Sequence, residues 1–173
     1  MIEIEKLRVG DYSVNCYIVH ESTRKDCVLV DPGYEPEHIL HHLAEENLTP
    51  GAILLTHAHF DHIGGVCPIV AATGVPVYLG PEATDLPDWL MRGYALPGED
   101  EENRANRQLL PEELHILREG DKISLAGIEF SVLETPGHAV GSLCYLCGDN
   151  MLSGDTLFCG TYGRTDLPGG SPA

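Results

Sequence analysis

Four side chains of metal-binding type lie within six residues of the chain, at His57, His59, Asp61 and His62. They follow the apolar run 52–55, and this order predicts a strand that ends in a loop rich in ligands. In an extended segment His57 and His59 lie on the same side and can hold one ion. Asp61 and His62 are displaced along the chain, so they can reach a second ion about 3.5–4 Å away, as in paired-metal hydrolytic sites. The spacing therefore indicates metal-dependent hydrolysis rather than surface histidines in a polar loop.

Two later residues, His138 and Asp155, extend this set of candidate ligands. His138 ends the segment Thr-Pro-Gly-His at 135–138, a turn whose backbone is restricted by proline and glycine. Asp155 follows an expected strand at 151–152. Each would be an ordinary turn residue if it stood alone. Six potential ligands in three separate loops need a common cause, and a metal supplies one.

Short apolar runs separated by turn residues predict the elements that must position these loops. Strands are expected at 2–9, 14–19, 27–30, 51–55, 75–79, 114–117, 122–125, 128–133, 143–146 and 151–152, and helices at 36–46 and 64–73. Many antiparallel strands with helices between and outside them indicate an α+β fold, in which two sheets pack face to face under outer helices. With 173 residues, 43% of them hydrophobic, the chain is expected to form one domain over 1–173.

The connection 81–111 interrupts this pattern with four prolines and a run of carboxylates at 99–102. It is expected to be irregular, with short helices, and to border the cleft. Long irregular connections often carry function, so Trp89 and Tyr94 are candidates to line a substrate cleft. Packing of both rings against the core is an equally good interpretation.

The charge balance excludes several classes of partner. Ten basic and 27 acidic residues give a net charge of −17, which repels both nucleic acid phosphates and anionic membranes. No run approaches the roughly 18 apolar residues of a membrane span, and the N-terminus lacks the plan of a signal peptide, so we expect a cytoplasmic protein. Its six cysteines are then expected to be reduced and buried, at Cys16, Cys27, Cys67, Cys144, Cys147 and Cys159.

Taken together, the motifs resemble the metallo-β-lactamase superfamily, and within it the glyoxalase II-like (hydroxyacylglutathione hydrolase) group. The resemblance covers essentially the whole chain and rests on Asp-Pro-Gly at 31–33, Thr-His-Ala-His-Phe-Asp-His at 56–62, Thr-Pro-Gly-His at 135–138 with Gly-Ser at 141–142, and Ser-Gly-Asp at 153–155. The segment Gly-Arg-Thr-Asp-Leu-Pro-Gly-Gly at 163–170 is similar to that group in particular. The resemblance to the superfamily implies an αββα sandwich of two mostly antiparallel sheets, with the metals held at one edge.

The same resemblance implies a role for each motif residue. His57, His59 and His138 match the ligands of a first metal, Asp61 and His62 match those of a second, and Asp155 matches the bridging carboxylate. Asp31 and Thr56 resemble groups that orient ligand imidazoles. Arg164 and Asp166 resemble a pair that supports the loop beside the site, and Arg164 is also a candidate for substrate contact.

These ligands imply a definite chemistry. Imidazoles with carboxylates suit two divalent metals, with zinc expected first and iron or manganese as alternatives. Such metals ionise a water near neutral pH, and the hydroxide would attack the carbonyl of a small-molecule thioester. Asp61 would orient that metal-bound water as well as bind metal. A thiolate leaves readily, so a strong general acid is not required.

The chain departs from the family pattern near its end. The family supplies one further histidine to the second metal, but no histidine follows His138 here. Residues 171–173 also read as the start of a helix, with Ser at the N-cap and Pro next to it. We therefore expect the natural protein to continue, with a C-terminal helix and strand absent from this chain. Without them the second metal would be held weakly or not at all.

The sequence is also compatible with two other functions. A persulfide dioxygenase would bind one iron through the equivalents of His57, His138 and Asp155. A non-catalytic metal-binding domain would keep the ligands and lack turnover, and the missing histidine is what supports it. The acyl group, the thiol carrier and the oligomeric state are not determined by these motifs.

Overall fold

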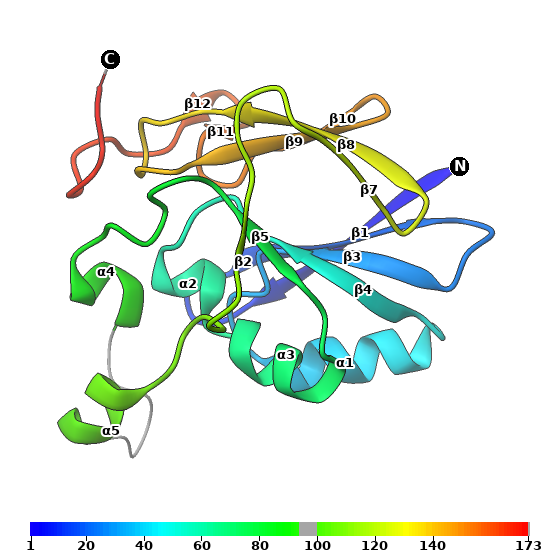
Figure 1. The fold of residues 1–173 in the computed structure, drawn as a ribbon, viewed down its shortest axis with the longest axis horizontal. Coiled ribbons are helices and arrows are strands. Elements are labelled where there is room, and N and C mark those ends of the chain that lie inside the picture. The colour runs from blue at the N-terminus through cyan, green and yellow to red at the C-terminus, as the bar shows by residue number, and fades with distance from the viewer. Residues whose placement is uncertain (94–99, 173) are drawn as a thin grey trace.

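Two β-sheets pack face to face in the computed structural model, which describes residues 1–93 and 100–172 (Figure 1). The first sheet has the order β1-β2-β3-β4-β5-β6 and the second the order β10-β9-β8-β7. The first comprises β1 (Ile2–Val9), β2 (Val14–Glu21), β3 (Asp26–Val30), β4 (Thr49–Leu54), β5 (Val77–Leu79) and β6 (His115–Ile116). The second comprises β7 (Lys122–Leu125), β8 (Ile128–Glu134), β9 (Leu143–Cys147) and β10 (Asn150–Leu152). The α+β sandwich expected from the sequence is confirmed.

The two sheets differ in the direction of their strands. The second sheet is antiparallel throughout, and so are the pairs β1–β2 and β2–β3. From β3 to β6 the neighbours are parallel, so the first sheet is mixed rather than mostly antiparallel. Parallel neighbours require crossover connections. Helix α1 (Pro36–Glu45) makes the crossover from β3 to β4, and α3 (Val66–Thr73) lies in the crossover from β4 to β5.

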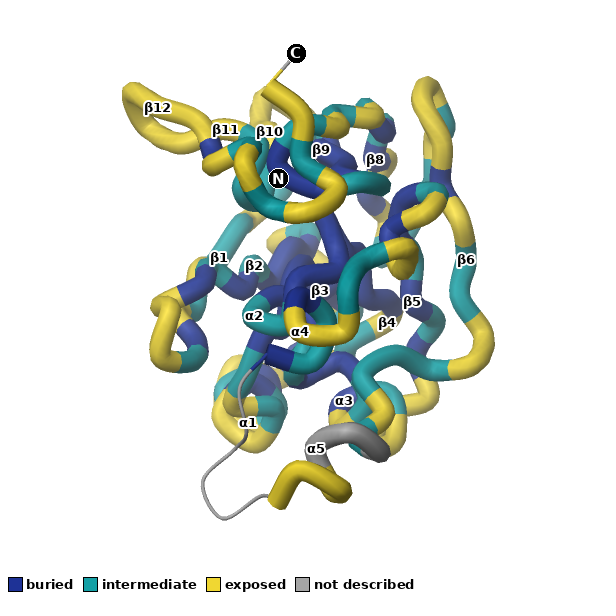
Figure 2. The backbone as a smooth tube through the Cα atoms, turned by 90° about the vertical axis from the view of Figure 1, so that its left-hand side faces the viewer, coloured by how far each residue is buried: buried dark blue, intermediate teal, exposed yellow. Residues whose placement is uncertain are grey.

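The central strands of the first sheet are buried on both faces. Along β3, Leu29 packs toward the helices, while Val28 and Val30 pack toward the second sheet. Because successive side chains of a strand point to opposite faces, one apolar strand can supply both cores. On the helix side, α1 contributes Ile39 and Leu43. This double burial explains why β3 and the second half of β4, residues 52–54, are apolar almost without interruption (Figure 2).

Short elements at one end of the sandwich carry the loops of interest. Helix α2 (Phe60–Ile63) follows β4, and a hairpin of β11 (Leu157–Phe158) and β12 (Thr161–Tyr162) follows β10. The hairpin is exposed, as Figure 2 shows. Helices α1 and α3 cover the outer face of the first sheet, but no helix within the described residues covers that of the second (Figure 1). Nor is any helix of the described chain long and apolar enough to cross a membrane.

The connection 81–111 contains α4 (Asp88–Arg92) and α5 (Glu101–Asn106). Leu90 is buried in α4, whereas Trp89 is 51% exposed, and its role at a substrate cleft stays a prediction. Tyr94, the other aromatic residue singled out in the sequence, lies outside the described residues.

The cysteines differ in part from expectation. Four are buried, but Cys67 is only partly buried and Cys159 is exposed, and all six are free thiols. Cys159 lies in the β11–β12 turn, where no second layer covers it. Burial of all six thiols was therefore a wrong prediction.

Two hydrogen bonds join the sheets beside the ligand loop. The Tyr145 hydroxyl on β9 donates to the Leu55 carbonyl oxygen at 2.6 Å. The Leu143 amide donates to the Thr56 carbonyl oxygen at 2.7 Å. The loop that leaves β4 is thus fixed by the second sheet immediately before His57.

Candidate metal centre

The loop after β4 is only partly extended. His59 is the N-cap of α2, with φ −68° and ψ 145°, and the helical turn starts at Phe60. Asp61 and His62 therefore lie on a short helix, not farther along an extended strand as the sequence had suggested. The turn brings both residues back toward His57, and the rings of His57 and His62 lie 4.1 Å apart between centroids.

Three histidines from two loops form the first group of potential ligands. One nitrogen of each of His57, His59 and His138 lies within 4.8 Å of the others, and all three residues are buried. The His138 Nε2 and His59 Nδ1 atoms are 3.0 Å apart. The segment 135–138 after β8 thus meets the loop after β4, although 79 residues separate His59 from His138.

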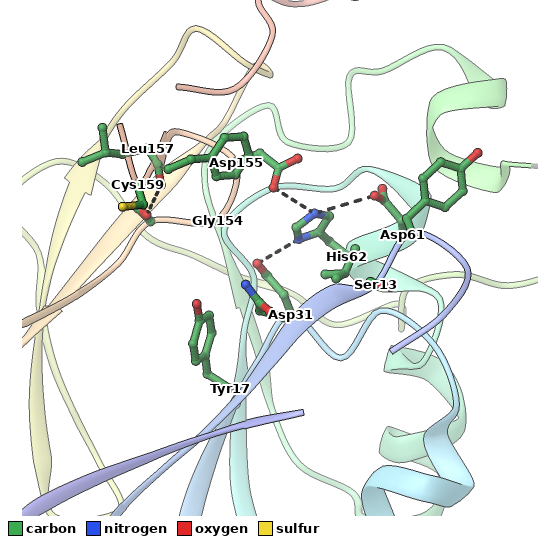
Figure 3. Close-up of a pocket in the computed structure, with 14 residues that line it drawn as sticks. Ser13, Tyr17, Asp31, Asp61, His62, Gly154, Asp155, Leu157 and Cys159 are labelled. Atoms are coloured by element: carbon green, nitrogen blue, oxygen red, sulfur yellow. Dashed lines mark hydrogen bonds and ion pairs between the residues drawn. The ribbon is translucent and has the colours of Figure 1, made fainter. Parts of the chain in front are cut away.

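The carboxylates complete a second group around His62 (Figure 3). The His62 Nε2 atom lies 3.4 Å from Asp155 Oδ1 and 3.9 Å from Asp61 Oδ2. The other Asp155 oxygen lies 3.4 Å from His138 Nε2. Asp155 therefore stands between the two histidine groups, and all six candidate ligands from the sequence converge at this point.

Asp31 organises the histidines from behind. Its Oδ1 accepts the Thr56 amide at 2.8 Å, and its Oδ2 accepts both the Thr56 hydroxyl at 2.6 Å and His62 Nδ1 at 2.9 Å. The Thr56 hydroxyl in turn lies 3.0 Å from His57 Nδ1. Because Thr56 donates its proton to Asp31, its oxygen is the acceptor for the His57 N–H. Both Asp31 oxygens are engaged, so its place is to orient the imidazoles and not to bind an ion.

A backbone carbonyl orients the third imidazole. His138 Nδ1 donates to the Arg164 carbonyl oxygen at 2.8 Å, which leaves Nε2 without a proton in the neutral ring. The Arg164 side chain points elsewhere and pairs with Asp166 through two bonds of 2.7 and 2.8 Å. Both side chains are well exposed.

Within the described part of the chain, three of the histidine nitrogen atoms at the centre lack a hydrogen-bond partner. Nε2 of His57, His59 and His62 is buried without a hydrogen-bond partner among the described residues. For His57 and His62 the opposite nitrogen donates to Thr56 or Asp31, so Nε2 of each neutral ring presents a bare lone pair. Buried polar atoms without partners are costly. Divalent metals at this point would satisfy them, so the residues present fit metal binding.

The electrostatics follow from burial and from mutual contact. Burial and the neighbouring histidines hold the pKa of His57 well below its usual range and lower the pKa of His59 to about 3. Burial opposes charge on His62 as well, but the carboxylates of Asp31, Asp155 and Asp61 together outweigh it, and the pKa of His62 is raised well above its ordinary value. Burial also raises the pKa of Asp61. Two neutral imidazoles, ready to accept a metal, thus stand beside one that must first release a proton.

The centre opens into a cavity of about 460 Å³. Asp61, His62 and Asp155 lie on its wall, and Tyr17 lies deeper in the same cavity (Figure 3). The exposed side chains of Tyr12, Leu157 and Phe158 give the opening an apolar rim, and no lysine or arginine is among the described residues that line the cavity. A small carbonyl compound would fit in this cavity, where metals bound at the centre would polarise its carbonyl group.

The backbone at two glycines, Gly33 and Gly163, lies in very close contact with the segments that carry the candidate ligands. A Cβ atom at position 33 would lie 1.7 Å from the Asp61 carbonyl oxygen. One at position 163 would lie 1.8 Å from the Asp155 carbonyl oxygen. Only glycine allows the two loops to approach the ligand segments this closely.

The roles of some residues that build the centre were not predicted from the sequence. The Arg164 carbonyl gave no signal, because every residue carries such a group and only the fold selects one. The Tyr145 hydroxyl also escaped notice, since tyrosine in an apolar strand is typical of packing. Tyr12 joins the cavity from a turn and Phe158 from the two-residue strand β11, and both segments are too short to show a periodic pattern.

Comparison with known proteins is consistent with this geometry. The model of the metallo-beta-lactamase superfamily matches residues 9–173. The chain is 35% identical over 168 residues to the probable metallo-hydrolase YqgX of Bacillus subtilis, covering 96% of this chain and 76% of that protein. It is 36% identical over 166 residues to the uncharacterized protein ML0493 of Mycobacterium leprae, covering 94% of this chain and 76% of that protein.

Solved structures give a similar result. BLEG-1, a B3 metallo-beta-lactamase, superposes with a TM-score of 0.78 at 35% identity, covering 97% of this chain and 79% of that one. TTHA1623 in a di-iron-bound form gives 0.77 at 39% identity, covering 97% and 80%. ETHE1 from Myxococcus xanthus gives 0.73 at 27% identity, covering 97% and 64%.

Proposed function

The chain belongs to the metallo-beta-lactamase superfamily, and from this premise we propose that it is a metal-dependent thioester hydrolase of the hydroxyacylglutathione hydrolase type. One observation carries the proposal: His62, with its unpartnered Nε2, lies with Asp61 and Asp155 on the wall of one open cavity, and the unpartnered Nε2 atoms of His57 and His59 are buried directly beside it. Such a site serves hydrolysis, because the attacking water and the substrate carbonyl can meet there.

The distances support a specific division of the ligands. We assign His57, His59 and His138 to one metal and Asp61 and His62 to the other, with Asp155 between them. The two Asp155 oxygens each lie 3.4 Å from a histidine nitrogen of a different group. Ligand atoms bound to one ion at about 2.0–2.1 Å with tetrahedral angles lie about 3.4 Å apart, so these separations suit shared coordination.

The protein residues prepare the reaction in two ways: Asp61 orients the attacking water, and Asp31 with Thr56 fixes the tautomer of the metal-binding imidazoles. Divalent metals bound here supply Lewis acidity and lower the pKa of water toward neutrality. Asp61 lies on the cavity wall and is placed to accept a hydrogen bond from the attacking water, which aims its lone pair at the substrate. Asp31 and Thr56 keep the imidazoles in the tautomer that leaves Nε2 bare.

The shape of the cavity favours a thioester among the possible substrates. No lysine or arginine among the described residues lines the cavity to protonate a poor leaving group, and a thiolate needs no such acid. The apolar rim at Leu157 and Phe158 suits an acyl chain. The cytoplasm, where thioesters are plentiful, is the proposed location.

A thiol-release assay on a panel of acyl-glutathione and acyl-coenzyme A thioesters tests the proposal. Asp61→Asn should lower kcat/KM by about 10²–10⁴-fold, a range typical of positioned acid–base groups. Asp149→Asn, in the exposed turn between β9 and β10, is the matched control and should leave kcat/KM unchanged. Absence of turnover on every thioester by metal-loaded protein would refute the assignment.

Metal content distinguishes the hydrolase from its strongest competitor. About two equivalents of zinc, or of zinc with iron, per chain in protein purified without chelators would support the hydrolase and show that the second site holds its metal without a further histidine. The likeness to ETHE1 favours persulfide dioxygenase activity as the second candidate. That activity would give a single iron and oxygen consumption with a persulfide, and no thiol release from thioesters.

The likeness to BLEG-1 makes β-lactam hydrolysis a necessary part of the same assay panel. Turnover of a chromogenic cephalosporin faster than of any thioester would replace the proposal. Full metal occupancy without turnover of any compound would instead indicate a non-catalytic metal-binding domain.

A further inference from the structure

A second cluster of potential ligands lies on the helix-covered face of the first sheet. Glu3 and Glu5 project from the edge strand β1, and His20 lies on β2 directly opposite Glu3. His42 of α1 reaches the same place from the helix layer. None of these residues belongs to the candidate metal centre, and none was assigned a role from the sequence.

The His20 ring is fixed and buried, with its side chain only 9% exposed. Its Nδ1 atom faces the Glu21 carbonyl oxygen at 3.4 Å, so Nδ1 carries the proton. Its Nε2 atom is buried and has no hydrogen-bond partner among the described residues. In the neutral ring a bare lone pair therefore points toward the cluster.

Two carboxylates face this lone pair. The His20 Nε2 atom lies 3.4 Å from Glu5 Oε1 and 3.6 Å from Glu3 Oε2. A lone pair and two negative charges repel one another unless a cation lies among them. A proton on Nε2 would also neutralise the cluster, but both contacts are longer than a charge-assisted hydrogen bond of about 2.7–2.9 Å, and the one proton of the neutral ring is directed by Nδ1 at the Glu21 carbonyl oxygen, which can only accept.

The observed separations suit a divalent ion better. Ligand atoms held at about 2.0–2.1 Å from a tetrahedral zinc ion lie about 3.4 Å apart. The second Glu5 oxygen accepts a hydrogen bond from His42 Nε2 at 2.8 Å, which orients this carboxylate as partners of metal ligands commonly do. Glu3 and Glu5 are half and one-third exposed, so both can adjust to an ion.

We propose that Glu3, Glu5 and His20 form a separate zinc site, with His42 as the residue that positions Glu5. The site would connect the edge strand β1 to β2 and, through His42, to α1. Its role is structural, since it lies on the helix side of the sheet and takes no part in hydrolysis. It does not depend on the proposed activity.

Zinc titration of protein whose catalytic centre has already been filled and freed of excess metal tests this site. Isothermal calorimetry should detect about one further equivalent of zinc per chain. His20→Gln should abolish this binding, and Glu5→Gln, which leaves the buried ring in place, should weaken it about 10–100-fold. His41→Gln is the matched control, because His41 and Glu45 also lie 3.5 Å apart but are well exposed, and it should bind as the parent does.

Thermal unfolding provides a readout that activity does not. Added zinc should raise the Tm of the parent and of His41→Gln, and should raise it less in His20→Gln and Glu5→Gln. Equal zinc stoichiometry in all four proteins would overturn the proposal. So would nitrogen-15 NMR that shows a protonated His20 Nε2 unaffected by zinc, because a proton alone would then neutralise the cluster.

Discussion

At the scale of single residues, Asp31 determines how the histidines present themselves. Its backbone has φ +52°, in the left-handed region that aspartate and asparagine tolerate better than most residues. This conformation directs the carboxylate back across the end of β4, where it accepts three hydrogen bonds. One side chain thereby orients two imidazoles, one directly and one through Thr56.

Replacement of Asp31 by asparagine should weaken metal binding without disturbing the backbone. Asparagine tolerates the same φ but removes the charge that holds the His62 Nδ1 proton. Loss of such a supporting partner typically costs about 10–100-fold in metal affinity. Competition with a chromophoric chelator measures the change. Asp26→Asn, at the start of β3, where the side chain pairs with Arg24 away from the candidate centre, should have no effect, and an unchanged affinity in Asp31→Asn would contradict the role of Asp31.

The histidine pKa values predict how the metal-free protein responds to acid. His57 and His59 have lowered pKa values, so below about pH 6.5 the unfolded chain binds two protons that the folded chain does not. Stability contributed by these residues is therefore lost as the pH falls. His62, whose pKa is raised, contributes stability that is fully present below pH 6.5 and lost only as the pH rises, so it does not offset this loss.

Urea unfolding of chelator-treated protein should reveal this dependence. The free energy of unfolding should decrease by about 1–3 kcal/mol per pH unit between pH 6 and 5, as a difference of one to two bound protons requires. A His57→Gln, His59→Gln double variant should show a smaller decrease. A free energy that rises on acidification would show that the two imidazoles become charged in the folded state.

At the scale of elements, the Asp-Pro-Gly turn after β3 must approach α2 very closely. Gly33→Ala should displace one of them, because the new Cβ would lie 1.7 Å from the Asp61 carbonyl oxygen and backbone cannot rotate away as a side chain can. We expect a loss of stability of several kcal/mol and metal content well below that of the parent, measured by denaturation and elemental analysis. At Gly51 the closest atom would be 3.6 Å away, so Gly51→Ala should retain its metal. Normal metal content in Gly33→Ala would disprove this packing argument.

The hydrogen bond between Tyr145 and Leu55 joins the two sheets where the ligand loop begins. Tyr145→Phe would leave a buried carbonyl oxygen without its donor, at a cost of about 1–3 kcal/mol. Equilibrium denaturation in urea measures this cost. Tyr162→Phe removes a hydroxyl from a residue that is 71% exposed and should change stability by less than about 0.5 kcal/mol. Equal stabilities for the two variants would mean that the inter-sheet bond contributes nothing.

Long apolar or alternating segments were predictable, and short ones were not. β1, β3 and α1 were expected within one or two residues of their bounds, because each presents a clear period to the core. α2 has four residues and β11 two, which is too short for any period to show. Four of the six candidate ligands, from His57 to His62, were predictable from their close spacing, whereas His138 and Asp155 were predictable from the turn motifs that contain them. The Arg164 carbonyl was not, because its role depends on the path of the chain alone.

At the scale of the whole molecule, the candidate centre draws on both sheets. His57 to His62 follow β4 of the first sheet, whereas His138 and Asp155 follow β8 and β10 of the second. Metals bound there would connect the two layers at one edge and stabilise only the state in which both are folded and docked.

Removal of metal should therefore lower the Tm of the entire domain in one step. A ligand present at 100 times its Kd stabilises a protein by about 2.7 kcal/mol, and metal sites commonly exceed this. Calorimetry before and after dialysis against a chelator measures the shift, and restoration by zinc is the control. An unchanged Tm would mean that the sheets dock equally well without metal.

The wide separation of the ligands in the chain also sets an order of events during synthesis. Asp155 follows His57 by 98 residues (155 minus 57), so at 5–20 residues per second it leaves the ribosome roughly 5–20 s later. For most of that interval a nascent chain offers His57, His59, His62 and Asp61, and His138 joins them only near its end, still without the Asp155 carboxylate that would join the two groups. The complete metal site can therefore form only late in translation. A metal ion bound earlier would be held by an incomplete and less selective set of ligands.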